Sequence, residues 1–195
     1  TPSDEQLEEI KKQKELEENR IKVENQLVEF MGDNQLIAPK ISLKAPVVWE
    51  SNPVNILNDL KNGVAHYKGT GLPGQTKSNI FIVGHSSNYL WDDGKYKQVF
   101  ALLDRLAVGD KIYLTRDKKP YIFNVEATKI VSPKDVAVLE PMDYSLVSLM
   151  TCYPVGTTLN RLIVQAKQIY PLEGDKVLSS VLSDDLLPSD LPKIR

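Results

Sequence analysis

One cysteine, one arginine and one histidine have the side-chain types of a nucleophilic site. Cys152 is the only cysteine of the chain, so it cannot form an internal disulfide and is either a small packed side chain or a reactive thiol. Arg161 follows nine positions later, and His85 lies far upstream. A permanent cation beside a thiol favours the thiolate, and an imidazole can take the thiol proton or pair with the thiolate. Together these groups could attack a carbonyl carbon.

The elements around Cys152 predict that the arginine reaches it. Residues 144–151 form an apolar run typical of a strand that ends at the cysteine, and residues 153–160 contain the proline and glycine of a loop. A second apolar run begins at Arg161. If the two strands pair antiparallel, the chain returns to the edge that it left, and Arg161 lies near Cys152.

Two histidines compete for the role of acid and base. The apolar run 79–84 predicts a strand that ends in a glycine directly before His85, on an edge where loops carry function. His66 lies just before the glycine-rich turn segment 69–74 and could pack or cap there. Taken singly, each candidate is more often structural: a packed cysteine, an exposed arginine at a strand edge, a histidine in a turn.

Several motifs in one order resemble the sortase family, and their joint occurrence favours the catalytic interpretation. The resemblance extends over most of the chain, from about Ile41 to Ile169. One departure is visible, because Ser148 stands where the family usually has threonine, and the hydroxyl is kept. The motifs are Gly63–Gly74, Gly84-His85-Ser86, Tyr96–Ile112, Ser148–Cys152 and the strand that Arg161 opens.

The resemblance implies a role for each residue. Cys152 would be the nucleophile, His85 its acid and base partner, and Arg161 the group that steadies substrate and oxyanion, while His66 would be structural. The substrates would be surface proteins that carry an LPxTG-like sorting signal. An amine of a peptidoglycan precursor or a pilin lysine would then accept the acyl group. The class within the family stays open, with classes D and E as candidates.

Two other functions stay open beside the transpeptidase. One is a cysteine endopeptidase that gives its acyl group to water, and the other is a barrel that binds an extended peptide without turning it over. The intact set of Cys152, His85 and Arg161 argues against the second. Release of free acid, as opposed to amide formation with an added amine, separates the two enzymes.

Composition excludes several other classes. The 26 acidic and 24 basic side chains nearly balance, and no basic cluster is interleaved with aromatics, so we expect no nucleic-acid partner. No cysteine and histidine array has metal-ligand spacing, and segment 69–74 lacks the lysine of a phosphate loop, so we expect neither metal nor cofactor.

The sequence contains no apolar run near the ~18 residues that a membrane span needs, and no signal peptide. Sortases are normally tethered by an N-terminal membrane helix. The resemblance therefore implies an anchor that lies outside this sequence and a site of action on the extracellular face of the membrane.

Three regions are predicted. Residues 1–34 form a charged helix or stalk, residues 35–171 the catalytic barrel, and residues 172–195 a C-terminal extension that includes a short amphipathic helix. Many short strands with turn signals predict a mainly β, antiparallel-rich closed barrel, which the resemblance sharpens to the eight-stranded sortase barrel. We also expect an apolar docking face on the first helix, made of Val23, Leu27, Phe30 and Met31. The runs 111–116 and 121–131 predict a strand hairpin, and the runs 55–61 and 97–106 predict two short helices.

Overall fold

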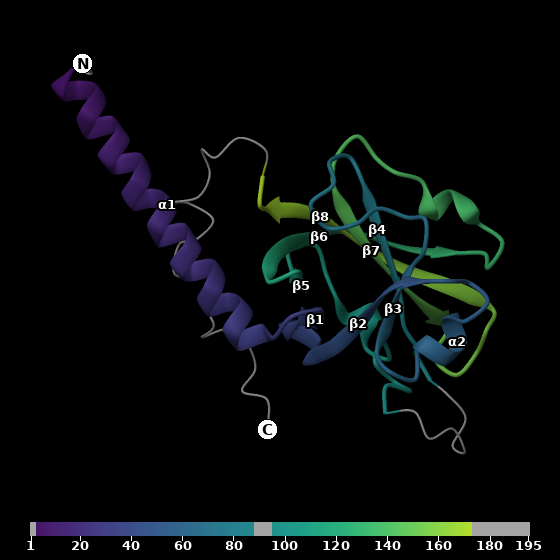
Figure 1. The fold of residues 1–195 in the computed structure, drawn as a ribbon. Coiled ribbons are helices and arrows are strands. Elements are labelled where there is room, and N and C mark those ends of the chain that lie inside the picture. The colour runs from purple at the N-terminus through teal and green to yellow at the C-terminus, as the bar shows by residue number, and fades with distance from the viewer. Residues whose placement is uncertain (1–2, 88–94, 173–195) are drawn as a thin grey trace.

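Eight strands close into a barrel in the computed structural model, which describes residues 3–87 and 95–172 (Figure 1). Around the barrel the order is β1-β2-β3-β4-β7-β8-β6-β5. The predicted mainly β barrel is confirmed, whereas the predicted C-terminal helix lies outside the described residues. The strands are β1 (Gln35–Ala38), β2 (Leu43–Ser51), β3 (Val64–Tyr67), β4 (Asn79–Val83), β5 (Lys111–Arg116), β6 (Lys119–Val131), β7 (Leu146–Tyr153) and β8 (Asn160–Tyr170).

Most neighbouring strands run antiparallel, and two pairs are parallel, β2 with β3 and β4 with β7. Apolar side chains from all eight strands form one buried cluster, which fills the barrel. Because side chains alternate between the two faces of a strand, the residues between them point outward. A second cluster forms on the outside of β3, β4 and β8, from Leu60, Ala65, Phe81, Val83 and Ile163; we call it the outer apolar cluster.

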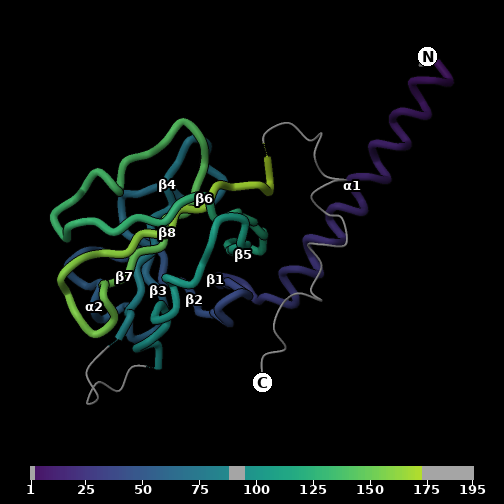
Figure 2. Tube along the Cα trace, turned by 180° about the vertical axis from the view of Figure 1, so that it is seen from behind, coloured from purple at the N-terminus to yellow at the C-terminus, as the bar shows by residue number. Residues whose placement is uncertain are grey.

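The long helix α1 (Asp4–Met31) precedes the barrel. Ser3 caps it with a reciprocal capping box, and only its last turns meet the barrel, through the buried Leu27 and Met31. The rest projects away from the barrel in both views (Figures 1 and 2). The predicted docking face is therefore narrower than expected, because Phe30 is 40% exposed.

The predicted hairpin is confirmed as β5 and β6, joined by Asp117 and Lys118, which both have positive φ angles. Two left-handed residues are what a tight hairpin turn with the twist of the strands requires. The helix predicted near 55–61 is confirmed as the short α2 (Ile56–Asp59).

The helix predicted over 97–106 is wrong. Described residues of that segment form turns and the single 3₁₀ turn η2 (Leu103–Arg105). Phe100, Leu103 and Leu106 are the buried side chains, so burial recurs every three residues rather than at the helical spacing. Two further 3₁₀ turns are η1 (Pro39–Ile41) and η3 (Val136–Leu139).

Candidate active site

Cys152 and Arg161 are direct partners across two antiparallel strands. In the register of β7 and β8, the Cα atoms of Cys152 and Arg161 stand opposite each other. The strand β7 begins two residues later than predicted and runs past the cysteine to Tyr153, but the predicted return of the chain is correct. Two residues directly opposite each other in an antiparallel pair have Cβ atoms about 4.5–5.5 Å apart, so the two side chains lie next to each other.

The strand β4 places His85 on the other side of Cys152. It runs parallel to β7 with Val83 opposite Met150, and the Gly84 amide donates to the Met150 carbonyl at 3.0 Å. His85 lies two residues after Val83, as Cys152 lies two residues after Met150, so the register leads the chain after β4 toward the cysteine. Cys152, Arg161 and the segment that follows β4 therefore lie at the same edge of the sheet.

Alternation puts the side chains of Cys152 and Arg161 on one face. Cys152 has the parity of Met150 and Arg161 that of Ile163, and these two reference residues belong to the outer apolar cluster or pack on it. The shared face is the outside of the barrel. Next to the polar edge, the half-buried Met150, Tyr67 and Val131 pack on the outer apolar cluster and present the apolar surface of this face.

Cys152 is half-buried, and Arg161 is fixed by its own loop. The Arg161 guanidinium donates through Nη1 to the carbonyls of Thr158 and Asn160, at 3.2 and 3.0 Å. These bonds use one nitrogen of the planar guanidinium, so other donors of the fork can point at a substrate oxygen.

Backbone contacts hold His85 in place. The Phe100 amide donates to the His85 carbonyl at 2.9 Å, and the Thr151 hydroxyl donates to the Gly84 carbonyl at 2.7 Å. A Cβ atom at position 84 would come within 2.5 Å of the Phe100 ring, so only glycine fits. Sequence reasoning missed these supporting roles of Phe100, Thr151 and Gly84; the glycine directly before the histidine was the available signal.

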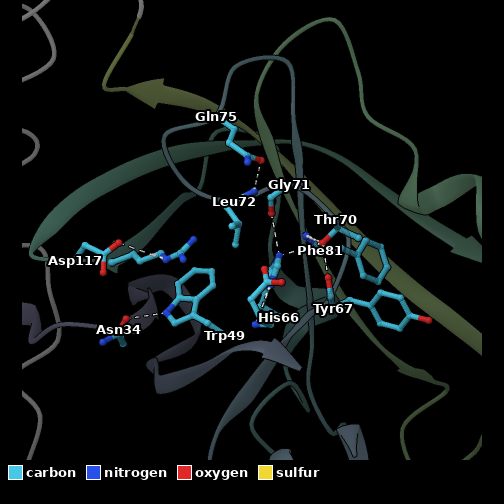
Figure 3. A network of polar contacts seen from close by, with 12 residues as sticks. Asn34, Trp49, His66, Tyr67, Thr70, Gly71, Leu72, Gln75, Phe81 and Asp117 are labelled. Atoms are coloured by element: carbon cyan, nitrogen blue, oxygen red, sulfur yellow. Dashed lines mark hydrogen bonds and ion pairs between the residues drawn. The ribbon is translucent and has the colours of Figure 1, made fainter. Parts of the chain in front are cut away.

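His66 lies elsewhere, inside the fold. Its side chain is fully buried, and Figure 3 shows the imidazole between the Trp49 ring and the backbone of Gly71. The Glu50 amide donates to Nδ1 at 3.3 Å, so Nδ1 carries no proton. Nε2 is then protonated and faces the Gly71 carbonyl at 2.9 Å and the Thr70 hydroxyl at 3.1 Å.

This environment fixes His66 as a neutral structural group. Burial lowers the pKa of His66, against the opposing effects of the Gly71 carbonyl and the Glu50 carboxylate. Every imidazole nitrogen has a protein partner, as a buried polar side chain requires. The ring joins the bulged end of β2 to the turn after β3, consistent with the packing role expected for it.

The described ranges 3–87 and 95–172 contain no group of three or more His, Cys, Asp or Glu residues that could hold a metal ion. Within the same ranges no helix is both long and apolar enough to cross a membrane.

Comparison with known proteins matches this architecture. A family profile described as Sortase domain matches residues 36–169. The chain is 29% identical to Sortase A of Bacillus anthracis over 126 residues, covering 65% of this chain and 54% of that protein. It is 31% identical over 71 residues to Putative sortase YwpE of Bacillus subtilis (strain 168), covering 36% of this chain and 70% of that protein. The chain thus spans about half the length of the first of these relatives.

Solved structures agree with the profile. The structure of Sortase C1 of GBS Pilus Island 1 is similar, with a TM-score of 0.61 and 25% identity, over 72% of this chain and 65% of that one. Sortase A from Corynebacterium diphtheriae, a lid mutant, gives a TM-score of 0.60 and 26% identity, over 72% of both chains. Relatives of types A and C thus fit almost equally well.

Proposed function

The chain belongs to the sortase family, and we propose that it is a cysteine transpeptidase with Cys152 as nucleophile, His85 as acid and base, and Arg161 as the hydrogen-bond donor to oxyanion and substrate. The observation that carries the proposal is the pairing of Cys152 with Arg161 across β7 and β8, next to the end of β4 that leads into His85.

The proposed reaction has two acyl transfers. The Cys152 thiolate attacks the scissile carbonyl carbon, and Arg161 stabilises the negative charge on oxygen, an interaction typically worth about 2.7–4 kcal/mol. Protonated His85 gives its proton to the departing amine, which leaves a thioester on the sulfur. An incoming amine then attacks the thioester, His85 accepts a proton from it, and the thiolate is regenerated as the new amide departs.

The proposed substrates are surface proteins with an LPxTG-like sorting signal. The half-buried Met150 and Tyr67, which pack on the outer apolar cluster, would offer apolar surface to such an extended peptide. The proposed acceptor is an amine of a peptidoglycan precursor or a pilin lysine, and the similarity to Sortase C1 of GBS Pilus Island 1 supports the pilin lysine. We propose that the enzyme works at the outer face of the cell membrane.

A peptide-library cleavage screen with several amines tests the proposal. We expect a sorting peptide to be cleaved with formation of a new amide, and Cys152→Ala to show neither product. Free acid formed at the same rate with and without amine would instead identify an endopeptidase. Binding of a sorting peptide without any cleavage would identify a peptide-binding barrel.

A further inference from the structure

The connection between β6 and β7, residues 132–145, lies over the face of the sheet that carries Cys152. Its 3₁₀ turn η3 packs Val138 and Leu139 against the outer apolar cluster. A peptide that lies on this face and reaches the thiol must run beside that turn. The position of the connection therefore sets the width of the peptide site.

One buried side chain, Asn79, ties this connection to the strand that leads to His85. Asn79 is the first residue of β4 and is 2% exposed. Its Nδ2 donates to the Val138 carbonyl at 2.9 Å and to the Glu140 carbonyl at 3.1 Å. The last carbonyls of a 3₁₀ turn have no partner within the turn, so the asparagine satisfies groups that would otherwise be orphaned.

The chemistry of the contact fixes the orientation of the amide. Two carbonyl oxygens can only accept, so the Nδ2 end must face them and both of its protons are used. The Oδ1 end is buried and has no hydrogen-bond partner among the described residues. Asparagine thus acts here as a double donor, a role that aspartate cannot fill.

Packing on the outer apolar cluster covers Val138 and Leu139 on one side only. Leu139 and Pro141 border a hollow of ≈ 710 Å³ that separates them from the turn segment 69–78. Two further side-chain ties lie at the end of the connection, beyond η3: the Tyr144 hydroxyl donates to the Glu126 carboxylate, and the Ser145 hydroxyl, which is exposed to solvent, donates to the Gln75 carbonyl at 3.0 Å. Water competes with an exposed hydrogen bond far more than with a buried one, so Asn79 provides the firmer attachment.

We infer that Asn79 is a positioning residue for substrate binding: it holds the wall formed by η3 at the spacing that an extended sorting peptide needs. The inference rests on the proposed function for its substrate. Asn79 sits at the start of β4 and His85 directly beyond its end, so one short strand links the peptide wall to the catalytic edge. Loss of the tie frees the wall without touching the reacting groups.

The test compares Asn79→Ala and Asn79→Asp with the native enzyme. For Asn79→Ala we expect the KM for an LPxTG-like peptide to rise about tenfold while kcat stays within about twofold, the pattern of lost substrate positioning. Asn79→Asp should be worse, because a carboxylate would face two carbonyl oxygens. Amide hydrogen exchange of residues 136–140 should accelerate about tenfold in both variants. Labelling of Cys152 by a small thiol-directed electrophile should keep its native rate.

Asn124→Ala is the matched control. Asn124 lies in β6, opposite Lys111 and Lys167, and its Oδ1 also lacks a partner among the described residues. It should leave the KM and the exchange of residues 136–140 unchanged. If Asn79→Asp does not fold, Asn79→Ala alone decides.

If amide hydrogen exchange of residues 136–140 is unchanged in Asn79→Ala, Asn79 does not hold η3 and the inference is wrong. Equal losses in kcat and in the labelling rate of Cys152 would overturn the positioning role in favour of a general structural one. If the native enzyme cleaves no sorting peptide, the proposed function fails by itself, and hydrogen exchange still decides whether Asn79 holds the wall.

Discussion

Replacing His66 by alanine should lower stability without removing the catalytic groups. The substitution leaves the Glu50 amide and the Gly71 carbonyl without their imidazole partners. An orphaned buried group costs ~1–3 kcal/mol. Because the Glu50 side chain is 43% exposed, water can reach part of the site, and we take the lower end for each group. With lost packing against Trp49 included, the expected loss is about 2–4 kcal/mol.

This loss corresponds to a fall in Tm of about 5–15 °C for a domain of this size. The effect should also depend on pH. In the unfolded chain His66 titrates near its ordinary pKa of 6.5, and burial lowers the pKa in the folded protein. The unfolded state therefore binds more protons in the window between the two pKa values. The free energy of unfolding of the native protein should fall as pH drops below about 6.5, by at most ~1.4 kcal/mol per pH unit.

Thermal unfolding at pH 8 and pH 5.5 measures both effects. The alanine variant lacks the titrating group, so the gap between native protein and variant should be widest at pH 8 and narrower at pH 5.5. His85→Ala serves as the matched control, since it should lose activity while keeping the native Tm. Equal melting of the native protein and His66→Ala at pH 8 would refute the structural role, and a gap that widens in acid would refute the neutral tautomer.

Four further outcomes are expected. Cys152→Ala should abolish turnover and thiol labelling at unchanged Tm; residual cleavage would remove the cysteine from the mechanism. His85→Ala should lose roughly 10²–10⁴-fold in rate, and a smaller loss than in His66→Ala would reverse the assignment of the two histidines. Arg161→Lys keeps the charge but not the planar fork, so the acylation rate should fall; near-native acylation would show that charge alone suffices. Tyr170→Phe removes the hydroxyl that donates to Glu24 and should speed hydrogen exchange in the last turns of α1, with activity unchanged.

The sequence predicted the local part of the site well. The strands that carry Cys152 and Arg161 are consecutive and joined by a short loop, so their antiparallel pairing follows from chain connectivity alone. The pairing of β7 with its other neighbour, β4, could not be predicted in this way. β4 pairs in parallel with β7, more than 60 residues later in the chain, and the residue pattern contains no signal for that contact; only the family resemblance brought His85 to the cysteine.

The segment before η2 shows why a pattern can mislead. Val99, Leu102, Leu103 and Leu106 have helical spacing, but Leu102 is 41% exposed. Phe100 is fully buried, and its backbone amide donates to the His85 carbonyl. A tertiary contact thus dictates the backbone there, and helix propensity yields to it.

The place where the chain enters and leaves the barrel has a mechanical consequence. Met31 at the end of α1 and Tyr170 at the end of β8 pack in one small cluster, at the far end of β8 from Arg161. In the closed order β1 stands opposite β7. A pulling force transmitted through α1 therefore enters the barrel at β1 and at the Tyr170 end of β8, away from the end that carries Arg161. At a rise of about 1.5 Å per residue, a helix of 28 residues adds a lever of about 42 Å. If the barrel is held through that helix, the load reaches it at the end of β8 opposite Arg161.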